Sequence, residues 1–411
     1  GHSLTATATD LAGNVSVASS GLDVTVDAVA PIVPTITSFS PDSAVVGDGS
    51  TNANHVTLTG AAEANSSVKI YDGNMLVGSA VANSNGAWSF NSGALADGMH
   101  NFTTTDTDAA GNVSASSSVM HVNVDTAAPV APVISSFSPD TATIGDGVTK
   151  ADVLTLSGAA EAGSTVKVYD GATLLGTALA GSNGAWTYTT GALSDGLHAF
   201  TSTDTDVAGN TSVTSAALHV NVDTVAPNVP TVTGFSPDTG TLGDGITTAS
   251  VLTVTGSGET NSTIKLYDGS SLLGTAAVDG NGAWSLTTQS LSAGTHNFTA
   301  TDVDAAGNVS GVSGGLAVDV QGISIGINTT SYLSNLRGLG LLSGTTEANS
   351  SLTISDSLSG KILAQVVANS TGSFSGLMSG LTNTVHSFDV LAKDALGNTG
   401  TQHLVVGSTA N

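Results

Sequence analysis

Short apolar runs alternate with polar turns along the whole chain, and inside the runs the alternation has a period of two residues. Val56 and Leu58 alternate with threonine, and Val68 and Ile70 lie on either side of Lys69. Side chains two positions apart share one face of a β-strand, so this pattern predicts strands with one buried face. No segment shows the 3.6-residue period of a helix.

Tight-turn dipeptides such as Asp72-Gly73 and Asn85-Gly86 separate these runs. Within one stretch of about 98 residues, strands are predicted near residues 33–38, 55–60, 66–71, 76–81, 87–91, 100–106 and 113–124. Seven short strands in a segment of this length predict an antiparallel β-sandwich of immunoglobulin type. Trp88, Leu95 and Phe102 are the large apolar residues available to fill its core.

The pattern recurs every 98 residues, as Trp88, Trp186 and Trp284 illustrate, without insertion or deletion. A period this long with strands inside it predicts a row of similar domains in an all-β chain, arranged as an extended rod. The predicted segments are the last strands of a truncated repeat at 1–26, a first repeat at 27–124, a second at 125–222, a third at 223–320 and a divergent fourth unit at 321–411.

Charge narrows the range of partners. The 411 residues include 32 acidic and 7 basic side chains, for a net charge of −25. Nucleic acid and anionic membrane would repel such a chain, whereas cations would be attracted. Charged residues make up only 9% of the sequence, so it is not a disordered acidic tail. There is no cysteine for disulfides or thiolate metal sites, and no stretch is apolar enough to span a bilayer.

The acidic residues keep register with the core residues. Each repeat is entered through Val-Asp-x-x-Ala-Pro, a short linker stiffened by proline, so neighbouring domains are expected to touch. A sandwich of this topology brings the linker aspartate, a loop glutamate and two aspartates spaced two apart to the same end of the domain. The predicted sets are Asp27, Glu63, Asp106 and Asp108; Asp125, Glu161, Asp204 and Asp206; and Asp223, Glu259, Asp302 and Asp304.

Four carboxylates at one joint would repel one another strongly unless a cation lies between them. Ca²⁺ fits best, because it accepts six to eight oxygen ligands in flexible geometry, whereas Zn²⁺ would favour histidine or cysteine. The alternative is that these are solvated surface acids. A second acidic feature, the Gly-Asp-Gly loop with Asp48, Asp146 or Asp244, is predicted to face the next joint. It either adds a ligand there or only forms a turn.

The fourth unit departs from the pattern. Gln321 replaces the linker aspartate and Ala392 replaces the first aspartate of the pair, while Glu347 and Asp394 remain. The joint near residue 321 is therefore predicted to bind Ca²⁺ weakly or not at all and to act as a hinge.

Catalytic patterns are missing from the sequence. We find no nucleophile–histidine–acid arrangement and no glycine-rich phosphate loop before a helix. His100, His198 and His296 each open a strand, and they are predicted to form strand-end hydrogen bonds. The sequence therefore predicts a protein that is not an enzyme.

The motifs Asp-x-Ala-Gly-Asn, Val-Asp-Thr-x-Ala-Pro and Asn-Gly-Ala-Trp resemble the bacterial Ig-like domains of large, biofilm-associated surface adhesins exported by type I secretion. The resemblance covers nearly the whole chain, less clearly 321–411. It implies Ca²⁺ at interdomain joints, a location at the bacterial cell surface, and a role as a stalk in cell adhesion.

Two other functions stay open. Similar domains occur as spacers in secreted polysaccharide-degrading enzymes. A self-assembling extracellular filament or surface layer is also conceivable, in which the strands of 1–26 complete another sandwich. Because His2 aligns with His100, the chain begins in the middle of a repeat. Its expected partners are therefore neighbouring repeats of a longer chain, together with cell-surface or matrix components or other copies of itself.

Overall fold

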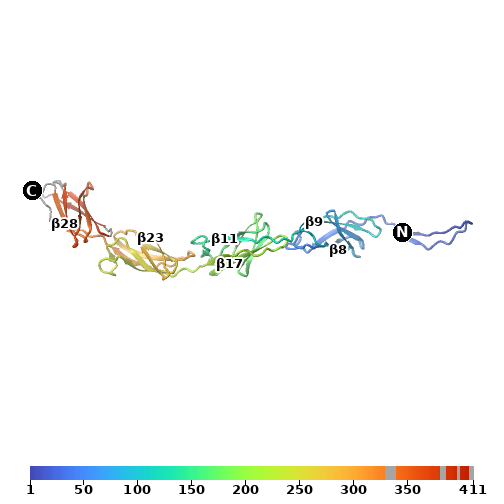
Figure 1. The fold of residues 1–411 in the computed structure, drawn as a ribbon, viewed down its shortest axis with the longest axis horizontal. Coiled ribbons are helices and arrows are strands. Elements are labelled where there is room, and N and C mark those ends of the chain that lie inside the picture. Colours follow the sequence, from blue (N-terminus) through green and yellow to red (C-terminus); the bar gives the residue numbers. More distant parts are fainter. Residues whose placement is uncertain (329–338, 380–385, 396–398, 407–411) are drawn as a thin grey trace. The chain divides into compact units, whose positions relative to one another are not determined.

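All regular structure in the described residues is β-strand, as the sequence predicts. The computed structural model describes residues 1–328, 339–379, 386–395 and 399–406. The strands form several antiparallel sheets, and no helix occurs among the described residues (Figure 1). The chain divides into two compact units, residues 1–140 with 151–222 and residues 141–150 with 223–411, which are described separately below.

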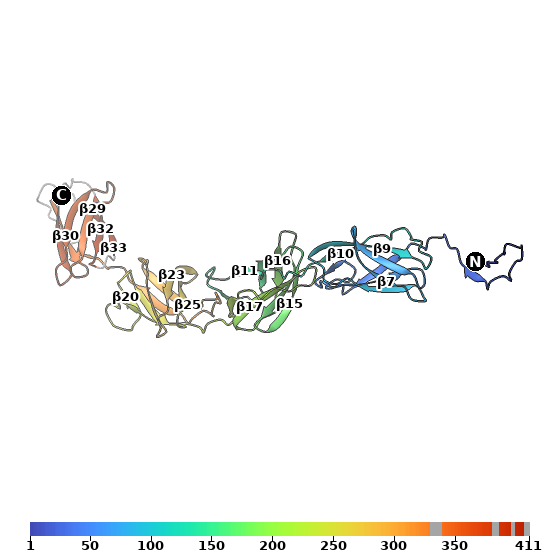
Figure 2. The same cartoon turned by 45° about the vertical axis from the view of Figure 1, so that its right-hand side comes forward.

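The first repeat is a sandwich of two sheets. Its strands are β3 (Thr35–Ser40), β4 (Ser50–Thr51), β5 (Thr57–Ala61), β6 (Ser67–Asp72), β7 (Met75–Val81), β8 (Ala87–Asn91), β9 (Gly98–Thr107) and β10 (Met120–Val124). One sheet has the order β3-β5-β8, and the other has the order β4-β10-β9-β6-β7. Figure 2 shows β7, β9 and β10 in the second of these sheets.

The second and third repeats reproduce this topology strand for strand. The second has β11 (Val133–Ser138), β12 (Val148–Thr149), β13 (Thr155–Ala159), β14 (Thr165–Asp170), β15 (Thr173–Leu179), β16 (Ala185–Thr189), β17 (Gly196–Thr205) and β18 (Leu218–Val222). The third has β19 (Thr231–Ser236), β20 (Ile246–Thr247), β21 (Thr253–Ser257), β22 (Thr263–Asp268), β23 (Ser271–Ala277), β24 (Ala283–Thr287), β25 (Gly294–Val303) and β26 (Leu316–Val320). Their sheets have the orders β11-β13-β16, β12-β18-β17-β14-β15, β19-β21-β24 and β20-β26-β25-β22-β23.

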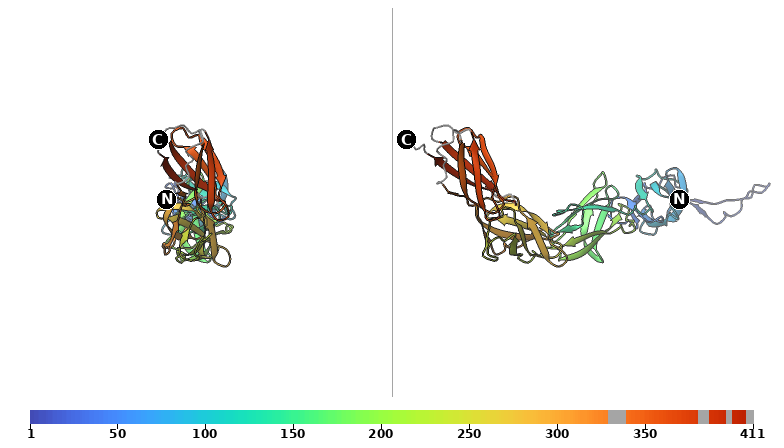
Figure 3. Two further views of the ribbon diagram at one scale, coloured as in Figure 1. Left: turned by 90° about the vertical axis from the view of Figure 1, so that its left-hand side faces the viewer. Right: turned by 60° about the vertical axis from the view of Figure 1, so that its left-hand side comes forward.

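The two ends of the chain differ from the repeats. The fourth unit has β27 (Gly326–Asn328), β28 (Leu339–Thr345), β29 (Ser351–Asp356), β30 (Ile362–Val367), β31 (Ser373–Ser379), β32 (His386–Lys393) and β33 (Thr399–Val406), in sheets β27-β28-β31 and β30-β29-β32-β33. Its strands are drawn in orange and red in Figure 3. Near the N-terminus, β1 (His2–Leu4) pairs antiparallel with β2 (Leu22–Val24).

The long strand β9 shows how one element serves both the core and the end of the domain. Phe102, Thr104 and Asp106 alternate with less buried residues and are each fully buried. Phe102 packs with Trp88 in the hydrophobic core, so the same face of the strand carries an aromatic ring at one level and a carboxylate four residues later. β17 and β25 repeat this arrangement.

The predicted strands are present in the structure, which differs from the prediction in two places. The predicted strand 113–124 is regular only over Met120–Val124, with an isolated bridge between Thr107 and Val113. The pairing of the two-residue strand β4 with β10 is parallel, and it is too short to give a sequence signal. Their spacing of two would place Asp106 and Asp108 on one face of a strand, but Asp108 follows the end of β9, so they do not share a strand face.

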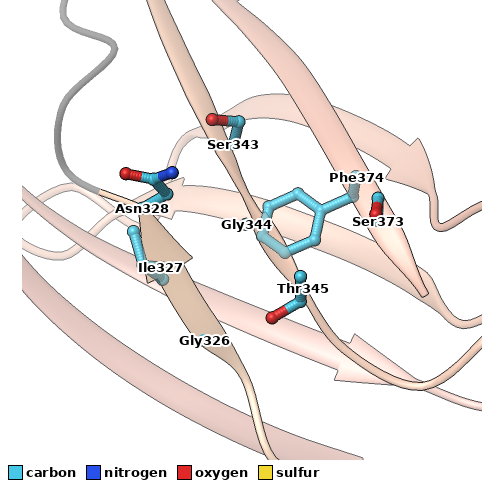
Figure 4. Close-up of a pocket in the computed structure, with 8 residues that line it drawn as sticks. All are labelled: Gly326, Ile327, Asn328, Ser343, Gly344, Thr345, Ser373 and Phe374. Carbon is cyan, nitrogen blue, oxygen red and sulfur yellow. The ribbon is translucent and has the colours of Figure 1, made fainter. Parts of the chain in front are cut away.

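One glycine per repeat permits a close approach between strands. A Cβ at Gly158 would lie 2.0 Å from the Val133 carbonyl oxygen and 2.6 Å from the ring of Trp186. Gly60 and Gly256 have the same surroundings in the first and third repeats. In the fourth unit the ring is Phe374, which lies against Gly344 beside a shallow cavity lined also by Asn328 and Thr345 (Figure 4).

Candidate cation site at the joints

A buried aspartate stands at the end of the long strand in each of the three repeats. In the second repeat Asp204 is 0% exposed, and its Oδ2 accepts a hydrogen bond of 2.9 Å from the backbone N–H of Glu161. Its Oδ1 is also buried but accepts no hydrogen bond from the described residues. Asp106 and Asp302 have the same two properties. A buried carboxylate oxygen without a partner is costly, so this atom could serve as a ligand if a cation bound here.

The second aspartate of the pair organises a tight turn. Asp206 Oδ1 accepts hydrogen bonds from the backbone N–H groups of Gly209 and Asn210, at 2.7 and 2.9 Å. The Asn210 side-chain amide then donates to Asp206 Oδ2 and to the carbonyl oxygen of Asp125, both at 2.8 Å. The linker is thereby fixed to the turn.

The same asparagine contact occurs at the other two joints. Asn112 donates to the Asp27 carbonyl at 3.2 Å, and Asn308 donates to the Asp223 carbonyl at 2.7 Å. These asparagines were not predicted as site residues from the sequence, although each ends the Asp-x-Ala-Gly-Asn motif. They position the linker, so they belong to the candidate site.

Three of the predicted acids of the second joint lie within electrostatic reach of the fourth, Glu161. The pKa of Glu161 is raised, first by burial and then by the charges of Asp206, Asp204 and Asp125. At the first joint the pKa of Asp108 is instead lowered, chiefly by the hydrogen bond from the Asn112 side chain. The aspartate charges at the second joint therefore disfavour ionisation of Glu161.

The fit to a cation is partial. The donor set consists of carboxylate and carbonyl oxygens, which are the ligands that Ca²⁺ prefers, and the buried Oδ1 atom lacks a partner. In the part of the chain that the structure describes, however, no three histidine, aspartate or glutamate side chains are placed where they could bind one ion together. The carboxylates are gathered at the joint but do not form a coordination shell.

The loop of the preceding repeat covers the aspartate turn. Ser43 Oγ donates to the carbonyl oxygen of Ala208 at 2.6 Å, and Thr141 Oγ1 donates to that of Ala306 at the same distance. Ala208 and Ala306 are both 0% exposed. Ala110, their counterpart in the first repeat, is exposed. Consecutive repeats therefore touch here, as the short linker predicts.

Backbone conformation shapes this contact. Ala44 and Ala142 have left-handed φ values of 59° and 60°, a conformation that costs a non-glycine residue about 1–2 kcal/mol. A Cβ added at Gly209 or Gly307 would lie 3.4 or 3.2 Å from the Cβ of these alanines. The glycine of the Asp-x-Ala-Gly-Asn turn thus gives room to the neighbouring loop.

The Gly-Asp-Gly aspartates form local turns. Asp48 Oδ1 accepts the N–H of Ser50 at 2.8 Å, Asp146 Oδ1 that of Val148 at 2.9 Å, and Asp244 Oδ1 that of Ile246 at 2.9 Å. Because Ser43 precedes Asp48 in the same loop, the loop does face the next joint. Its contact there is made by the serine hydroxyl.

In the fourth unit an alanine occupies the structural position of the buried aspartate. Ala392 pairs with Leu352 in the register in which Asp204 pairs with Val166, so an apolar side chain replaces the buried carboxylate. The pKa of Glu347 is raised, first by burial and then by Asp394, although a hydrogen bond from Thr248 lowers it. These groups line a cavity of about 630 Å³ that also contains Gln321.

Glu161→Gln gives a test of the electrostatic strain at the second joint. A carboxyl group whose pKa is raised on folding lowers stability as pH rises from its unfolded value of 4.5 through its folded value. In chelator at pH 7, the variant is therefore expected to melt at a higher temperature than the parent chain, and calcium is expected to raise its melting temperature less. Asp146→Asn, which removes an acid from the local turn, is the control. A lower melting temperature for Glu161→Gln in chelator would contradict this account.

These features define a class of protein: tandem immunoglobulin-like sandwiches entered through short linkers that each carry one aspartate in the three repeats. The bacterial Ig-like domain family matches residues 30–126, 128–224 and 226–320, well over half of the chain. The chain therefore belongs to the bacterial Ig-like domain family. The described residues include no helix that is both long and apolar enough to cross a membrane.

Three similar proteins put this family in context. Chitinase A1 of Niallia circulans is 32% identical over 186 residues, which is 43% of this chain and 25% of the chitinase. The chain thus spans about a quarter of that relative's length. The tetra-tandem repeat in the extending region of a large adhesion protein is 21% identical, with a TM-score of 0.26, over 93% of this chain and 100% of that one. A 1.5-MDa bacterial ice-binding adhesin is 18% identical, with a TM-score of 0.27, over 68% of this chain and 98% of that one.

Proposed function

We propose that this chain is a calcium-rigidified extension segment of a bacterial cell-surface adhesin. In this role the repeats carry no catalytic group. They hold a separate binding module away from the cell during adhesion or biofilm formation. The partners of each repeat are then the repeats before and after it, and the working location is extracellular.

The observation that carries the proposal is the buried, unpartnered Oδ1 of Asp106, Asp204 and Asp302, repeated at the same place in three sandwiches. A divalent cation would supply the missing partner and reduce the repulsion among the surrounding acids. At the second joint the ion would draw Asp204, Glu161, Asp206 and the linker Asp125 into one coordination shell, which these side chains do not form in the described structure. The equivalent ligands would be Asp27, Glu63, Asp106 and Asp108 at the first joint, and Asp223, Glu259, Asp302 and Asp304 at the third.

Rigidity follows from where these ligands lie. The linker aspartate belongs to the segment that connects two repeats, whereas the other acids belong to the repeat that follows. An ion bound to both would restrict rotation about the linker. The hydroxyl contact of Ser43 with Ala208 already supports the same joint from the preceding repeat.

A second candidate is a non-catalytic spacer in a secreted polysaccharide-active enzyme. The observation that favours it is the 32% identity to part of a chitinase. Calcium-stabilised joints would serve a spacer equally well. Sequencing the neighbouring parts of the gene separates the two functions, because a catalytic domain on the same chain would support the spacer.

The joint near residue 321 tests the role of the acids in rigidity. Since the chain has no cysteine, pairs of spin labels can be attached at introduced cysteines without background. With Thr173→Cys and Ser271→Cys, which flank the joint between the second and third repeats, calcium is expected to narrow the distance distribution. With Ser271→Cys and Leu358→Cys, which lie on either side of the last joint, the distance distribution is expected to stay broad.

The combined substitutions Gln321→Asp and Ala392→Asp restore the missing acids and are expected to make the last joint respond to calcium. If calcium narrowed the distance distribution at the unmodified last joint as much as at the preceding joint, the proposed hinge would be contradicted. If neither joint responds to calcium, the proposed function itself fails.

A further inference from the structure

Each of the three repeats holds one histidine between two hydrogen-bond acceptors. His198 Nδ1 lies 2.7 Å from Asp170 Oδ2, and its Nε2 lies 2.8 Å from the carbonyl oxygen of Ser194. His100 lies between Asp72 and the Ala96 carbonyl at 2.6 and 2.9 Å. His296 lies between Asp268 and the Ser292 carbonyl at the same two distances.

Both contacts need a proton. A backbone carbonyl can only accept a hydrogen bond, and an ionised carboxylate can only accept one, whereas neutral imidazole has a single N–H. The arrangement is therefore complete only when the histidine and aspartate together hold two protons. A neutral ring would leave one of its nitrogens facing an acceptor without a hydrogen between them.

The surroundings of the ring favour this protonated state. Burial alone would lower the pKa of His198, but its hydrogen bonds to Asp170 and Ser194 and the charge of Asp170 outweigh burial and raise it. The pKa values of His100 and His296 are raised for the same reasons. The charged group facing the His100 ring is Asp72. Those acting on the His296 ring are Asp268 and Asp319. Each ring also stacks on a core phenylalanine, with His198 and Phe200 centroids 5.8 Å apart.

The first repeat connects its histidine to the linker. Ala96, whose carbonyl His100 contacts, is followed by Asp97, and Asp97 Oδ1 accepts hydrogen bonds from the N–H and hydroxyl groups of Thr126 at 3.1 and 2.9 Å. Thr126 directly follows the linker aspartate Asp125. His100 thus contacts the Ala96–Asp97 turn, and this turn is hydrogen-bonded to the linker.

The third repeat lacks the residues for the contact between turn and linker that Asp97 and Thr126 make in the first repeat. Ala293 stands at the position of Asp97, and Gly322 stands at the position of Thr126. Neither of these two residues carries a carboxylate or hydroxyl group, although His296 keeps both of its own contacts. The second repeat has Asp195 and Thr224 at these positions.

We propose that His100, Asp72 and the turn at Ala96–Asp97 form a proton-dependent latch on the linker leaving the first repeat. The latch is separate from the cation cluster, because none of its groups is among the proposed ligands. It ties the linker to the repeat that precedes it, whereas the acids tie it to the repeat that follows.

The direction of the pH dependence follows from the pKa. A histidine whose folded pKa is raised above the ordinary 6.5 contributes stability that is fully present below 6.5 and is lost as pH rises through the folded pKa. The linker is therefore held below pH 6.5 and released as the pH rises through the raised folded pKa of His100.

NMR titration of the full chain in chelator, between about pH 5.5 and 9.5, a range that covers a histidine titration, tests the latch without occupying any cation site. The His100 ring and the Thr126 amide are expected to titrate with one shared midpoint above 6.5. Asp72→Asn is expected to lower that midpoint for both. Asp97→Ala is expected to leave the His100 titration in place and to remove the response of Thr126. The Gly322 amide provides a natural control that is expected not to follow His296.

A His100 midpoint at or below 6.5 would overturn the proposal, as would a Thr126 amide that does not follow His100 in the unmodified chain. Retention of the Thr126 response in Asp97→Ala would also overturn it, because the turn would then not transmit the protonation. None of these outcomes depends on calcium binding, so the latch and the proposed function can fail separately.

Discussion

Asp204→Asn is expected to abolish the calcium-dependent stabilisation of the second repeat. The substitution keeps the shape of the side chain and an oxygen for the Glu161 N–H, but it removes the charge and half of the carboxylate. With calcium at about 100 times its dissociation constant, binding to the folded state alone adds about 2.7 kcal/mol. For a domain of this size that corresponds to roughly 10 °C or more in melting temperature. Scanning calorimetry of the full chain in calcium and in chelator measures the difference.

The control for this prediction is Asp146→Asn, which changes a carboxylate whose Oδ1 accepts the N–H of Val148 within its own local turn. The fourth unit is an internal reference, because Ala392 already occupies the position of the buried aspartate. If the calcium-induced shift of the second repeat survives Asp204→Asn at full size, Asp204 is not a ligand.

Gly158→Ala is expected to destabilise the second repeat by about 3 kcal/mol or more, a large value for the addition of one methyl group. The new Cβ would lie 2.0 Å from the Val133 carbonyl oxygen, which is a backbone atom in the neighbouring strand. Neither this carbonyl nor the Trp186 ring can move away without disturbing the sheet or the core. Calorimetry is expected to show the transition of this repeat shifted to a much lower temperature while those of the other repeats stay in place.

Gly191→Ala in the same repeat is the matched control. A Cβ there would meet no atom within 4 Å, and its φ lies outside the left-handed region. Its effect is expected to stay within about 0.5 kcal/mol. Equal melting temperatures for the two alanine variants would show that the sheet accommodates the methyl group at Gly158 and that the close approach is not a constraint.

The fold could be predicted from the sequence because its signals are local. Period-two alternation and Asp-Gly or Asn-Gly turns placed most strands to within a few residues. The exceptions have physical reasons. β4 is only two residues long, and the segment 113–119 looks like a strand in sequence but forms only an isolated bridge before β10 begins at Met120.

The site was predictable only in outline. The recurrence of linker, loop and paired acids pointed to the joint, but two features depend on contacts between distant residues. Ser43 and Ala208 are 165 residues apart, so their hydrogen bond has no sequence signal. The different environments of Asp204 and Asp206 could not be foreseen either. One is buried at the end of β17, whereas the other bonds to its own turn.

The strict 98-residue period has a structural reason in the long strands. β17 carries Phe200 into the core and Asp204 to the joint on the same face. A one-residue insertion between them would turn one of the two side chains to the opposite face. Core packing and the acid cluster therefore constrain the same register.

The most direct test of the central claim is the melting of the unmodified chain in calcium and in chelator. The account predicts that calcium raises the melting temperature of the three repeats, whose joints carry Asp27, Asp125 and Asp223, and has little effect on the fourth unit, which begins at Gln321. Superimposable melting curves in calcium and in chelator would contradict it, because the gathered carboxylates would then bind no stabilising cation.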